Sequence, residues 1–548
     1  MKRSDRVIAV LFLGICFFIS LLEIAARFHI RFAHKLINRH ETLIEGQGFR
    51  PDNKQPNERR IFLLGQSAAR GIPYPPESST SSYLEKLLRS ETGSNVRVIN
   101  VRIQDTHSFH EREAPETLIR YGADAVILYT GNNETRDFSY TIRDVPFAYT
   151  DLKLTWNLRL WWGMKRKLMS LKTFINKTAG RQIFVINYNQ DDVWHWTDTY
   201  LRKKRLYYKN PELAQKRKKR AMHDFEVNLS ALVRDLKARG TKVYIASLPI
   251  VHERKLQIRD WPRKGYKFEQ KILFHSAREE PMWKSLFEMG RDKVARGDFN
   301  EGIEFLEKAR SINDTYPALL HELAKAYAGL KQYSLAKTLY VQAKDAQVQS
   351  PGGDSSKNNV LRRVTERFNV PLVDLQNPLE TVAPNGILGR SLFHHHGLPN
   401  LLGHKVIAAR LAQSLCEDGF ILCRKESLNW KTQLERLIGG RLDAERLAQE
   451  YFSVALYRLY ETSSASPPYE EAVEYLNLAR EGATSAKAAK LLRNIDLYLA
   501  ASYWQLGKRN DAKTCLARVL DKNIKDYRVV WRKFPYLIDL AQSLTKHN

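Results

Sequence analysis

Residues 60–69 read RIFLLGQSAA, an apolar run of strand length that ends in the tripeptide Gly65-Gln66-Ser67. Residues 81–88 then show a helical pattern, so the serine lies at a turn between a strand and a helix. Backbone N–H groups and the helix dipole at such a turn favour a nucleophile and stabilise an oxyanion. Ser67 is therefore a candidate nucleophile, although a turn that only requires small residues has the same sequence.

Apolar strands alternate with amphipathic helices over much of the remaining chain. The predicted strands are 61–65, 96–101, 125–129, 243–246 and 371–375, and the predicted helices are 81–88, 114–121, 225–236, 360–368 and 401–415. This alternation predicts an α/β fold of the flavodoxin-like type, a three-layer arrangement in which helices cover both faces of a parallel sheet. Because ligands bind beyond the carboxyl ends of the strands in such sheets, Ser67, residues 102–108 and Asn133 share the expected site.

Four stretches in this order resemble the sequence blocks of the SGNH/GDSL hydrolases: Gly65-Gln66-Ser67, residues 100–108, residues 131–134 (GNNE) and residues 399–408 (PNLLGHKVIA). The chain looks most like bacterial membrane-anchored members that carry tetratricopeptide repeats. The resemblance implies an SGNH-like fold in which Ser67 attacks an ester or acyl carbonyl. It implies that Asn133 donates to the oxyanion together with backbone N–H groups, and it implies no bound metal or organic cofactor.

The last block departs from the family pattern Asp-x-x-His, in which the histidine is the base and the aspartate orients it. Alignment without gaps puts His395 at the acid position and Leu398, which cannot accept a proton, at the base position. One of the three adjacent histidines, His394, His395 or His396, is the candidate base, with His395 and His396 preferred, and a degenerate, inactive site is the alternative. In the second block, Asp105 stands where a glycine N–H lines the oxyanion hole in much of the family, and a carboxylate there would repel an oxyanion.

The cysteines and histidines lack the spacing of metal ligands. The four cysteines are scattered, and His394 and His396 have no suitably spaced Asp, Cys or fourth His nearby. No metal site is therefore expected. Cys416 and Cys423 form a disulfide if the chain is exported, and two separate thiols are an equally open alternative.

The N-terminus has the pattern of an uncleaved signal anchor. Three basic residues precede an apolar run that extends, with one interruption, over residues 7–26, close to the roughly 17–25 residues that cross a bilayer. No small-residue cleavage site follows. Residues 1–28 are predicted to be a transmembrane anchor and residues 29–59 a linker; a cleaved signal peptide or a buried helix is the alternative. The expected location is the bacterial inner membrane, with the main domain in the periplasm or outside the cell.

Two insertions are predicted within the SGNH-like domain, which spans residues 60–420. Residues 136–220 contain five tryptophans among clusters of Lys and Arg, and the chain has a formal net charge of +28. This composition suits a membrane interface, an acidic glycan or a lipid, or a solvated charged helix over a small aromatic core; nucleic acid is not the expected partner of an anchored protein. Within residues 282–348 the residue pattern repeats with a period of 34, as in Leu286 and Leu320. This period resembles the tetratricopeptide repeat and predicts a protein partner.

Residues 421–548 are helical in pattern and show the same repeat spacing at Leu499, Ala500, Tyr503 and Gly507. They form either a protein-binding surface or a cap that only stabilises the fold. Two functions therefore remain open. One is a membrane-anchored esterase or acyltransferase that acts on acyl esters of an envelope glycan or lipid. The other is a catalytically inactive SGNH-like scaffold that binds glycan or protein partners through its repeats and basic surface.

Overall fold

The computed structural model describes residue 44, residues 46–135 and residues 210–520. Within these ranges the undescribed residues are 72, 93–94, 103–106, 113, 254–259, 262–265, 268–271, 273, 275, 277, 348–349, 396, 439–443, 461–468 and 484–487. The predicted anchor at 1–28, most of the basic aromatic insertion at 136–220, Asp105 and His396 lie outside the described residues. In the described part of the chain, no helix has both the length and the apolar character needed to cross a membrane.

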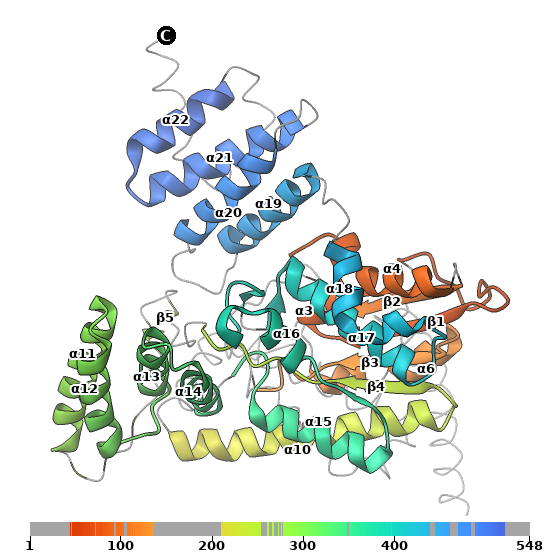
Figure 1. Ribbon diagram of the computed structural model, residues 1–548, viewed down its shortest axis with the longest axis horizontal. Coiled ribbons are helices and arrows are strands. Elements are labelled where there is room, and N and C mark those ends of the chain that lie inside the picture. The colour runs from red at the N-terminus through yellow and green to blue at the C-terminus, as the bar shows by residue number, and fades with distance from the viewer. Residues whose placement is uncertain are drawn as a thin grey trace, which may run out of the picture.

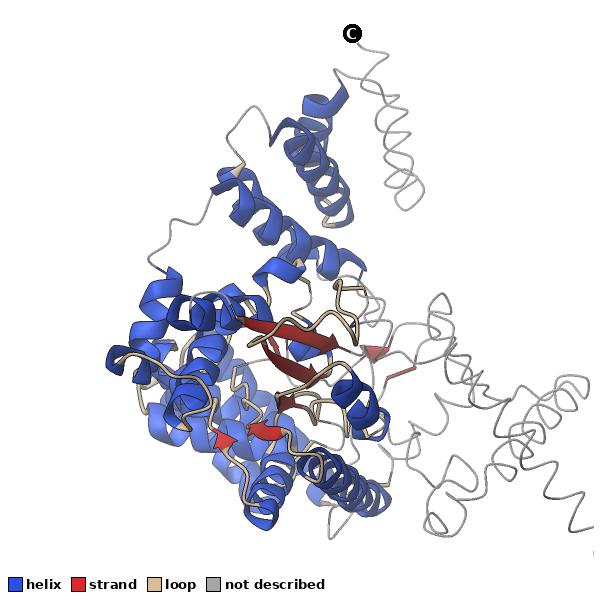
Figure 2. Ribbon diagram, turned by 90° about the vertical axis from the view of Figure 1, so that its right-hand side faces the viewer, coloured by secondary structure: helices blue, strands red, loops and turns tan. Residues whose placement is uncertain are grey.

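A five-stranded parallel sheet forms the centre of the α/β domain (Figure 2). Its strands are β1 (Arg59–Gly65), β2 (Val96–Arg102), β3 (Ala125–Tyr129), β4 (Lys242–Ala246) and β7 (Leu372–Val373). Their order in the sheet is β2-β1-β3-β4-β7, and every neighbouring pair is parallel. This is the doubly wound, flavodoxin-like order, which confirms the predicted parallel sheet. β3 is buried along its whole length, as expected of a strand covered on both faces.

Helices cover both faces of the sheet (Figure 1). One layer consists of α4 (Thr80–Thr92), α17 (Leu401–Glu417) and α18 (Trp430–Ile438), which pack against one another. The other layer consists of α5 (Ser108–Glu111), α6 (Ala114–Arg120), α10 (Pro211–Lys237) and α15 (Ser355–Phe368), with α10 in contact with the other three. The buried side chains of α10 recur at helical spacing between Phe225 and Leu236, the pattern that predicted this helix. Residues 211–220, at the end of the predicted insertion, form the first turns of α10.

Shorter elements complete the α/β domain. They are α3 (Ser67–Arg70), η1 (Pro76–Ser78), α16 (Gln376–Val382), η3 (Pro384–Gly386), β8 (Phe393–His395), β9 (Leu398–Pro399) and η4 (Lys425–Leu428). β8 and β9 form an antiparallel hairpin just before α17. A separate antiparallel ribbon consists of β5 (Asp260–Trp261) and β6 (Tyr266–Lys267). Because Leu434 and Leu437 of α18 belong to the main hydrophobic core, the packing of this domain continues past residue 420.

A helical unit is inserted between β4 and α15 and lies at one side of the sheet (Figure 1). Its helices are α11 (Glu279–Arg296), α12 (Phe299–Ile312), α13 (Pro317–Gly329) and α14 (Tyr333–Asp345), and consecutive helices pack together. A Cβ atom at Gly290 would lie 2.6 Å from Cγ of Leu306, so the crossing of α11 and α12 requires a residue without a side chain. Two helix pairs thus occur where the 34-residue recurrence predicted repeats; their assignment to the tetratricopeptide class stays a prediction.

A second helical unit follows the α/β domain and has a hydrophobic core of its own (Figure 1). Its helices are α19 (Ala444–Tyr460), α20 (Tyr469–Gly482), α21 (Ala489–Gln505) and α22 (Arg509–Leu520). Leu499 and Ala500 are buried in this core, in keeping with the repeat spacing. The described residues of the C-terminal region are therefore helical, as predicted.

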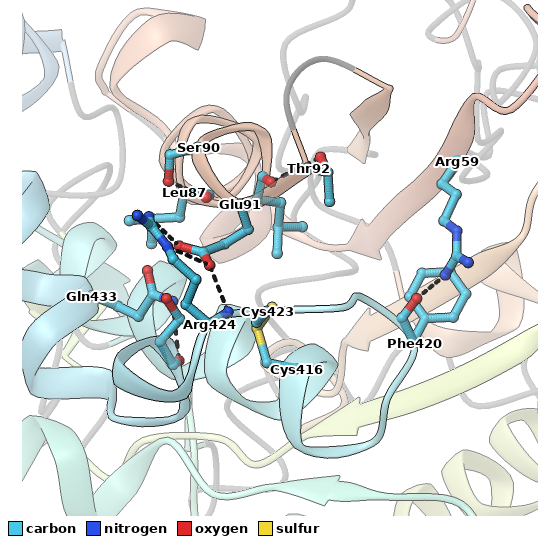
Figure 3. Close-up of a disulfide and its surroundings, with 12 residues drawn as sticks. Arg59, Leu87, Ser90, Glu91, Thr92, Cys416, Phe420, Cys423, Arg424 and Gln433 are labelled. Carbon is cyan, nitrogen blue, oxygen red and sulfur yellow. Dashed lines mark hydrogen bonds and ion pairs between the residues drawn. A yellow bond between two sulfur atoms is a disulfide. The ribbon is translucent and has the colours of Figure 1, made fainter.

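A disulfide joins Cys416, near the end of α17, to Cys423, with an S–S distance of 1.98 Å (Figure 3). Beside it, Glu91 of α4 accepts hydrogen bonds from the backbone N–H of Arg424 at 3.0 Å and from its guanidinium at 3.1 Å. Burial raises the pKa of Glu91, but hydrogen bonds from Arg424 and Arg436 outweigh this effect and lower the pKa to about 2. The disulfide and the ion pair together fasten the segment after α17 to α4.

Candidate active site

Ser67 lies where β1 ends and α3 begins, at the carboxyl edge of the sheet. A Cβ atom at Gly65 would lie only 2.3 Å from the carbonyl oxygen of Tyr129 on β3, so β1 can enter this turn only with glycine there. At the other end of α3, the side-chain amide of Asn100 donates to the carbonyl oxygen of Ala69 at 2.8 Å. Both ends of the turn are thus fixed, and the half-buried Ser67 is held at a helix N-terminus.

Gln66 connects the serine turn to the turn that follows β3. Its fully buried side chain accepts a hydrogen bond from the backbone N–H of Asn133 at 2.8 Å and donates to Glu134 at 3.2 Å. Gly131, at the start of that second turn, has a φ of 111°, which favours glycine. The structure therefore brings Ser67 and Asn133, two of the predicted site residues, to the same edge of neighbouring strands.

A pair of buried carboxyl groups lies in the hydrogen-bond network of Gln66. Glu134 accepts hydrogen bonds from the backbone N–H of Ser108 at 2.8 Å and from its hydroxyl at 3.0 Å. Glu111 accepts one from the hydroxyl of Thr130. Burial raises the pKa of Glu111 to about 8; the Thr130 hydrogen bond opposes this rise and the charge of Glu134 adds to it. Burial also raises the pKa of Glu134, against the effect of its donors. At neutral pH Glu111 is therefore mostly protonated.

The β8–β9 hairpin brings the fourth sequence block to the serine turn. β9 packs against α3, and Leu398 is only 8% exposed. In the hairpin register His395 pairs with Leu398, so the residues at the family's acid and base positions lie opposite each other. The alignment puts a leucine at the base position, and this leucine lies on β9, the strand that packs against α3. The side chain of His395 and the whole of His396 lie outside the described part of the structure.

Two further histidines near the site are fully buried. Nδ1 of His394 lies 3.0 Å from the carbonyl oxygen of Leu398, which closes the hairpin, and its ring centroid is 5.7 Å from that of Tyr74. Nδ1 of His404, on α17, lies 2.8 Å from the hydroxyl of Thr80, on α4, and burial lowers its pKa to about 3. His394 therefore holds the hairpin together, and a neutral His404 joins α17 to α4. Among the described residues, no group of three or more His, Cys, Asp or Glu side chains is arranged to hold a metal ion.

The segment 350–353, which precedes α15 in the chain, supports the turn that contains Asn132 and Asn133. The backbone N–H of Gly352 donates to the carbonyl oxygen of Asn132 at 3.0 Å, and the buried ammonium of Lys357 donates to the Gly352 carbonyl at 2.7 Å. A Cβ atom at Gly397 would lie 2.9 Å from Cα of Gly352 and 3.2 Å from Oδ1 of Asn132. The loop of the β8–β9 hairpin, residues 350–353 and the turn that follows β3 therefore meet at one place.

The C-terminal helical unit also reaches the hairpin. Arg458 of α19 donates from its guanidinium to the carbonyl oxygen of His394, and it pairs with Glu471 of α20 at 2.8 Å. The ring centroid of Tyr457 lies 5.9 Å from that of His394. Residues far beyond the α/β domain in sequence thus contact the strand that carries the candidate base.

Sequence reasoning missed four residues of this site. Gln66 and Glu134 belong to the sequence blocks that resemble the family. Each is a polar residue directly next to a predicted site residue, and this position was the signal that could have identified them. Glu111 and Arg458 carry no such signal, because their roles depend on elements that only the fold brings near them.

Comparison with known proteins gives fold-level likeness only. No family model matches the chain, and no curated protein matches it. Solved structures similar to the chain include a lipase/acylhydrolase from Enterococcus faecalis, at 11% identity, covering 67% of this chain and 99% of that chain, with a TM-score of 0.28. A catalytic mutant of an acetylxylan esterase from Geobacillus stearothermophilus matches at 12% identity, covering 68% and 99%, with a TM-score of 0.30. A putative lipolytic protein of the G-D-S-L family from Desulfitobacterium hafniense matches at 9% identity, covering 65% and 98%, with a TM-score of 0.26. These proteins are esterases and lipases; the fold of this chain is established by its own strand order.

Proposed function

We propose that the chain is an SGNH/GDSL-type esterase or acyltransferase that acts on acyl esters of a glycan or lipid in the bacterial envelope. The observation that carries the proposal is the side chain of Gln66, which holds the N–H of Asn133 at 2.8 Å and so ties the asparagine turn to the turn of Ser67. Ser67 begins the single helical turn α3, whose first backbone N–H groups have no partner within the helix and can donate to negative charge. A serine and a neutral amide at neighbouring strand ends are parts that acyl transfer requires.

In the proposed reaction, Oγ of Ser67 attacks the ester carbonyl carbon while a histidine takes its proton. The side-chain amide of Asn133 and the backbone N–H of Ser67 donate to the oxyanion of the tetrahedral intermediate. Its collapse breaks the carbon–oxygen bond, the histidine gives the proton to the leaving alcohol, and an acyl-enzyme remains. Water then completes hydrolysis, or a hydroxyl of an acceptor completes transfer.

His395 and His396 are the proposed sources of the base. The backbone of His395 lies directly across the hairpin from Leu398, the residue that aligns with the family's base, and β9 packs against α3. A base from this loop would come from the same sequence block as in the family that the chain resembles, a few residues earlier.

A catalytically inactive scaffold is the second candidate function, and Leu398 is the observation that favours it. Its side chain is buried in the main hydrophobic core, at the aligned base position, and cannot accept a proton. On this alternative the site binds an acylated glycan or a protein partner without cleaving it.

We further propose that residues 7–26 anchor the chain in the inner membrane, with the main domain in the periplasm or outside the cell. The disulfide between Cys416 and Cys423 supports this location, because disulfides persist in oxidising compartments. The net charge of +28 supports an anionic partner such as an acidic glycan or lipid head groups. The two helical units support a protein partner, since stacked helix pairs commonly provide binding surfaces.

The test is labelling of the purified protein with a fluorophosphonate, which traps serines that have a working base and oxyanion hole. Ser67→Ala is expected to abolish labelling, and Asn133→Ala to slow it on the order of 10²–10³-fold. Ser82→Ala, which removes a half-buried serine of α4, is the matched control and is expected to label like the wild type.

Separate His395→Ala and His396→Ala variants then identify the base, because only the one that carries it should lose labelling. A folded wild-type protein that does not label at all would refute the enzyme proposal in favour of the scaffold. Labelling that persists in Ser67→Ala would show that the reactive serine lies elsewhere.

A further inference from the structure

One arginine of the C-terminal helical unit donates a hydrogen bond to the backbone of the histidine hairpin, which consists of β8, β9 and the two residues between them. The side chain of Arg458 is 4% exposed, and its guanidinium donates to the carbonyl oxygen of His394. Glu471 of α20 pairs with the same guanidinium at 2.8 Å and so fixes its direction. A charged donor makes roughly twice as strong a hydrogen bond to a carbonyl as a neutral one. The peptide that Arg458 holds is the one that leads directly into His395.

Helix α19 contacts the site at two further points. The ring of Tyr457 lies 5.9 Å from the ring of His394, within the range of aromatic contact. Glu450 accepts a hydrogen bond from the hydroxyl of Ser78, in η1, and both groups are fully buried. Because η1 follows the serine helix α3 in the chain, α19 touches both the segment after Ser67 and the hairpin that faces it.

The strand pairing within the hairpin is short, although Phe393 and Leu398 are buried in the main hydrophobic core. β8 and β9 form two residue pairs, with an irregularity in the register between Phe393 and His395. An isolated two-stranded hairpin is marginally stable in water. Contacts from outside the hairpin therefore decide where its histidines lie relative to Ser67.

We infer that the C-terminal helical unit is a working part of the active site, in which Arg458 is a positioning residue that sets the location of the histidine hairpin. The inference rests on the proposed function. It assigns to this unit a role in the reaction in addition to any role as a cap or a binding surface. Removal of the guanidinium releases the His394 carbonyl and lets the base move away from the serine.

Arg390 provides a matched control in the same interface. Its exposed guanidinium pairs with Glu471 at 3.2 Å and with Glu474 at 3.5 Å. Arg390→Ala thus removes a cation that bonds the same helix α20 but leaves the bond to His394 intact. Arg458→Lys keeps a charged donor that can reach a carbonyl, without the fork of the guanidinium.

Two measurements on the full chain separate the outcomes: hydrolysis of a 4-nitrophenyl ester, and amide hydrogen exchange of peptides that cover residues 392–400 and β1 to β3. Arg458→Ala is expected to lower kcat on the order of 10²-fold, as a displacement of a catalytic group does, with KM little changed. Amide hydrogen exchange of residues 392–400 should become faster, while the amides of β1 and β3 stay protected. Arg458→Lys should recover part of kcat, and Arg390→Ala should resemble the wild type.

The inference is overturned if Arg458→Ala leaves both kcat and hairpin exchange as they are in Arg390→Ala. It is also overturned if exchange rises equally in β1 and β3, because the arginine then supports the whole fold. A wild type without turnover would refute the proposed function alone; hairpin exchange in Arg458→Ala would still show whether the arginine positions the hairpin.

Discussion

Glu111→Gln is expected to make the stability of the protein less dependent on pH. Burial raises the pKa of Glu111 from its ordinary value of 4.5 to about 8. Between these values the folded state keeps a proton that the unfolded state has lost, so the wild type loses stability as pH rises. Each pH unit costs about 1.4 kcal/mol, which amounts to about 5 kcal/mol over the whole interval. Above pH 8 the loss is complete and the stability no longer changes on this account.

Glutamine has nearly the same shape, stays neutral, and keeps an acceptor for the hydroxyl of Thr130. The assay is urea unfolding of both proteins at a series of pH values between about 5 and 9. The free energies of unfolding are compared where both proteins have the same m-value. The stability of Glu111→Gln relative to the wild type should rise steadily up to about pH 8 and then level off. Glu116→Gln, which replaces an exposed glutamate of α6, is the control and should show no such rise. A difference that is independent of pH, or that grows toward acid pH, would refute the argument.

Two other substitutions test contacts that hold the site and the domain. Gln66→Leu removes the acceptor of the Asn133 N–H; it is expected to cost about 1–3 kcal/mol, because a buried donor is left without a partner, and to slow fluorophosphonate labelling of Ser67. Unchanged urea stability would contradict this. Cys416→Ser opens a short disulfide loop to Cys423, with a sequence separation of 7, and should cost about 2.5 kcal/mol by the loop-entropy relation. The reduced wild type should match it, and equal stability of the oxidised and reduced proteins would show that the crosslink does not constrain the unfolded chain.

The parts of the fold that follow from local pattern were predictable. The apolar run before Gly65-Gln66-Ser67 predicted β1 and its turn, and the helical spacing between Phe225 and Leu236 predicted α10. A strand buried on both faces and a helix buried on one face each leave a periodic pattern in their own residues. The parallel sheet follows from the alternation of such elements, which leaves few topologies open.

Distances between segments were less predictable. The gapless alignment put Leu398 at the base position, which stays a prediction; the contact of its strand β9 with α3 came from the structure. The start of α10 at Pro211 was missed, since its first turns are rich in Lys and Arg and bury only Ala214. A helix turn without a buried face leaves no apolar period from which to predict it.

Sequence alone supplied the candidates for the chemistry: a serine after β1, an amide after the neighbouring strand β3, and histidines before α17. Tertiary structure alone decided their environment. It buried Glu111 in the network of Gln66, which sets its pKa, and it brought Arg458 to the carbonyl of His394. The physical reason is that periodicity and turn chemistry act within a few residues, whereas burial and charge act through space, on whatever distant segment the fold places alongside.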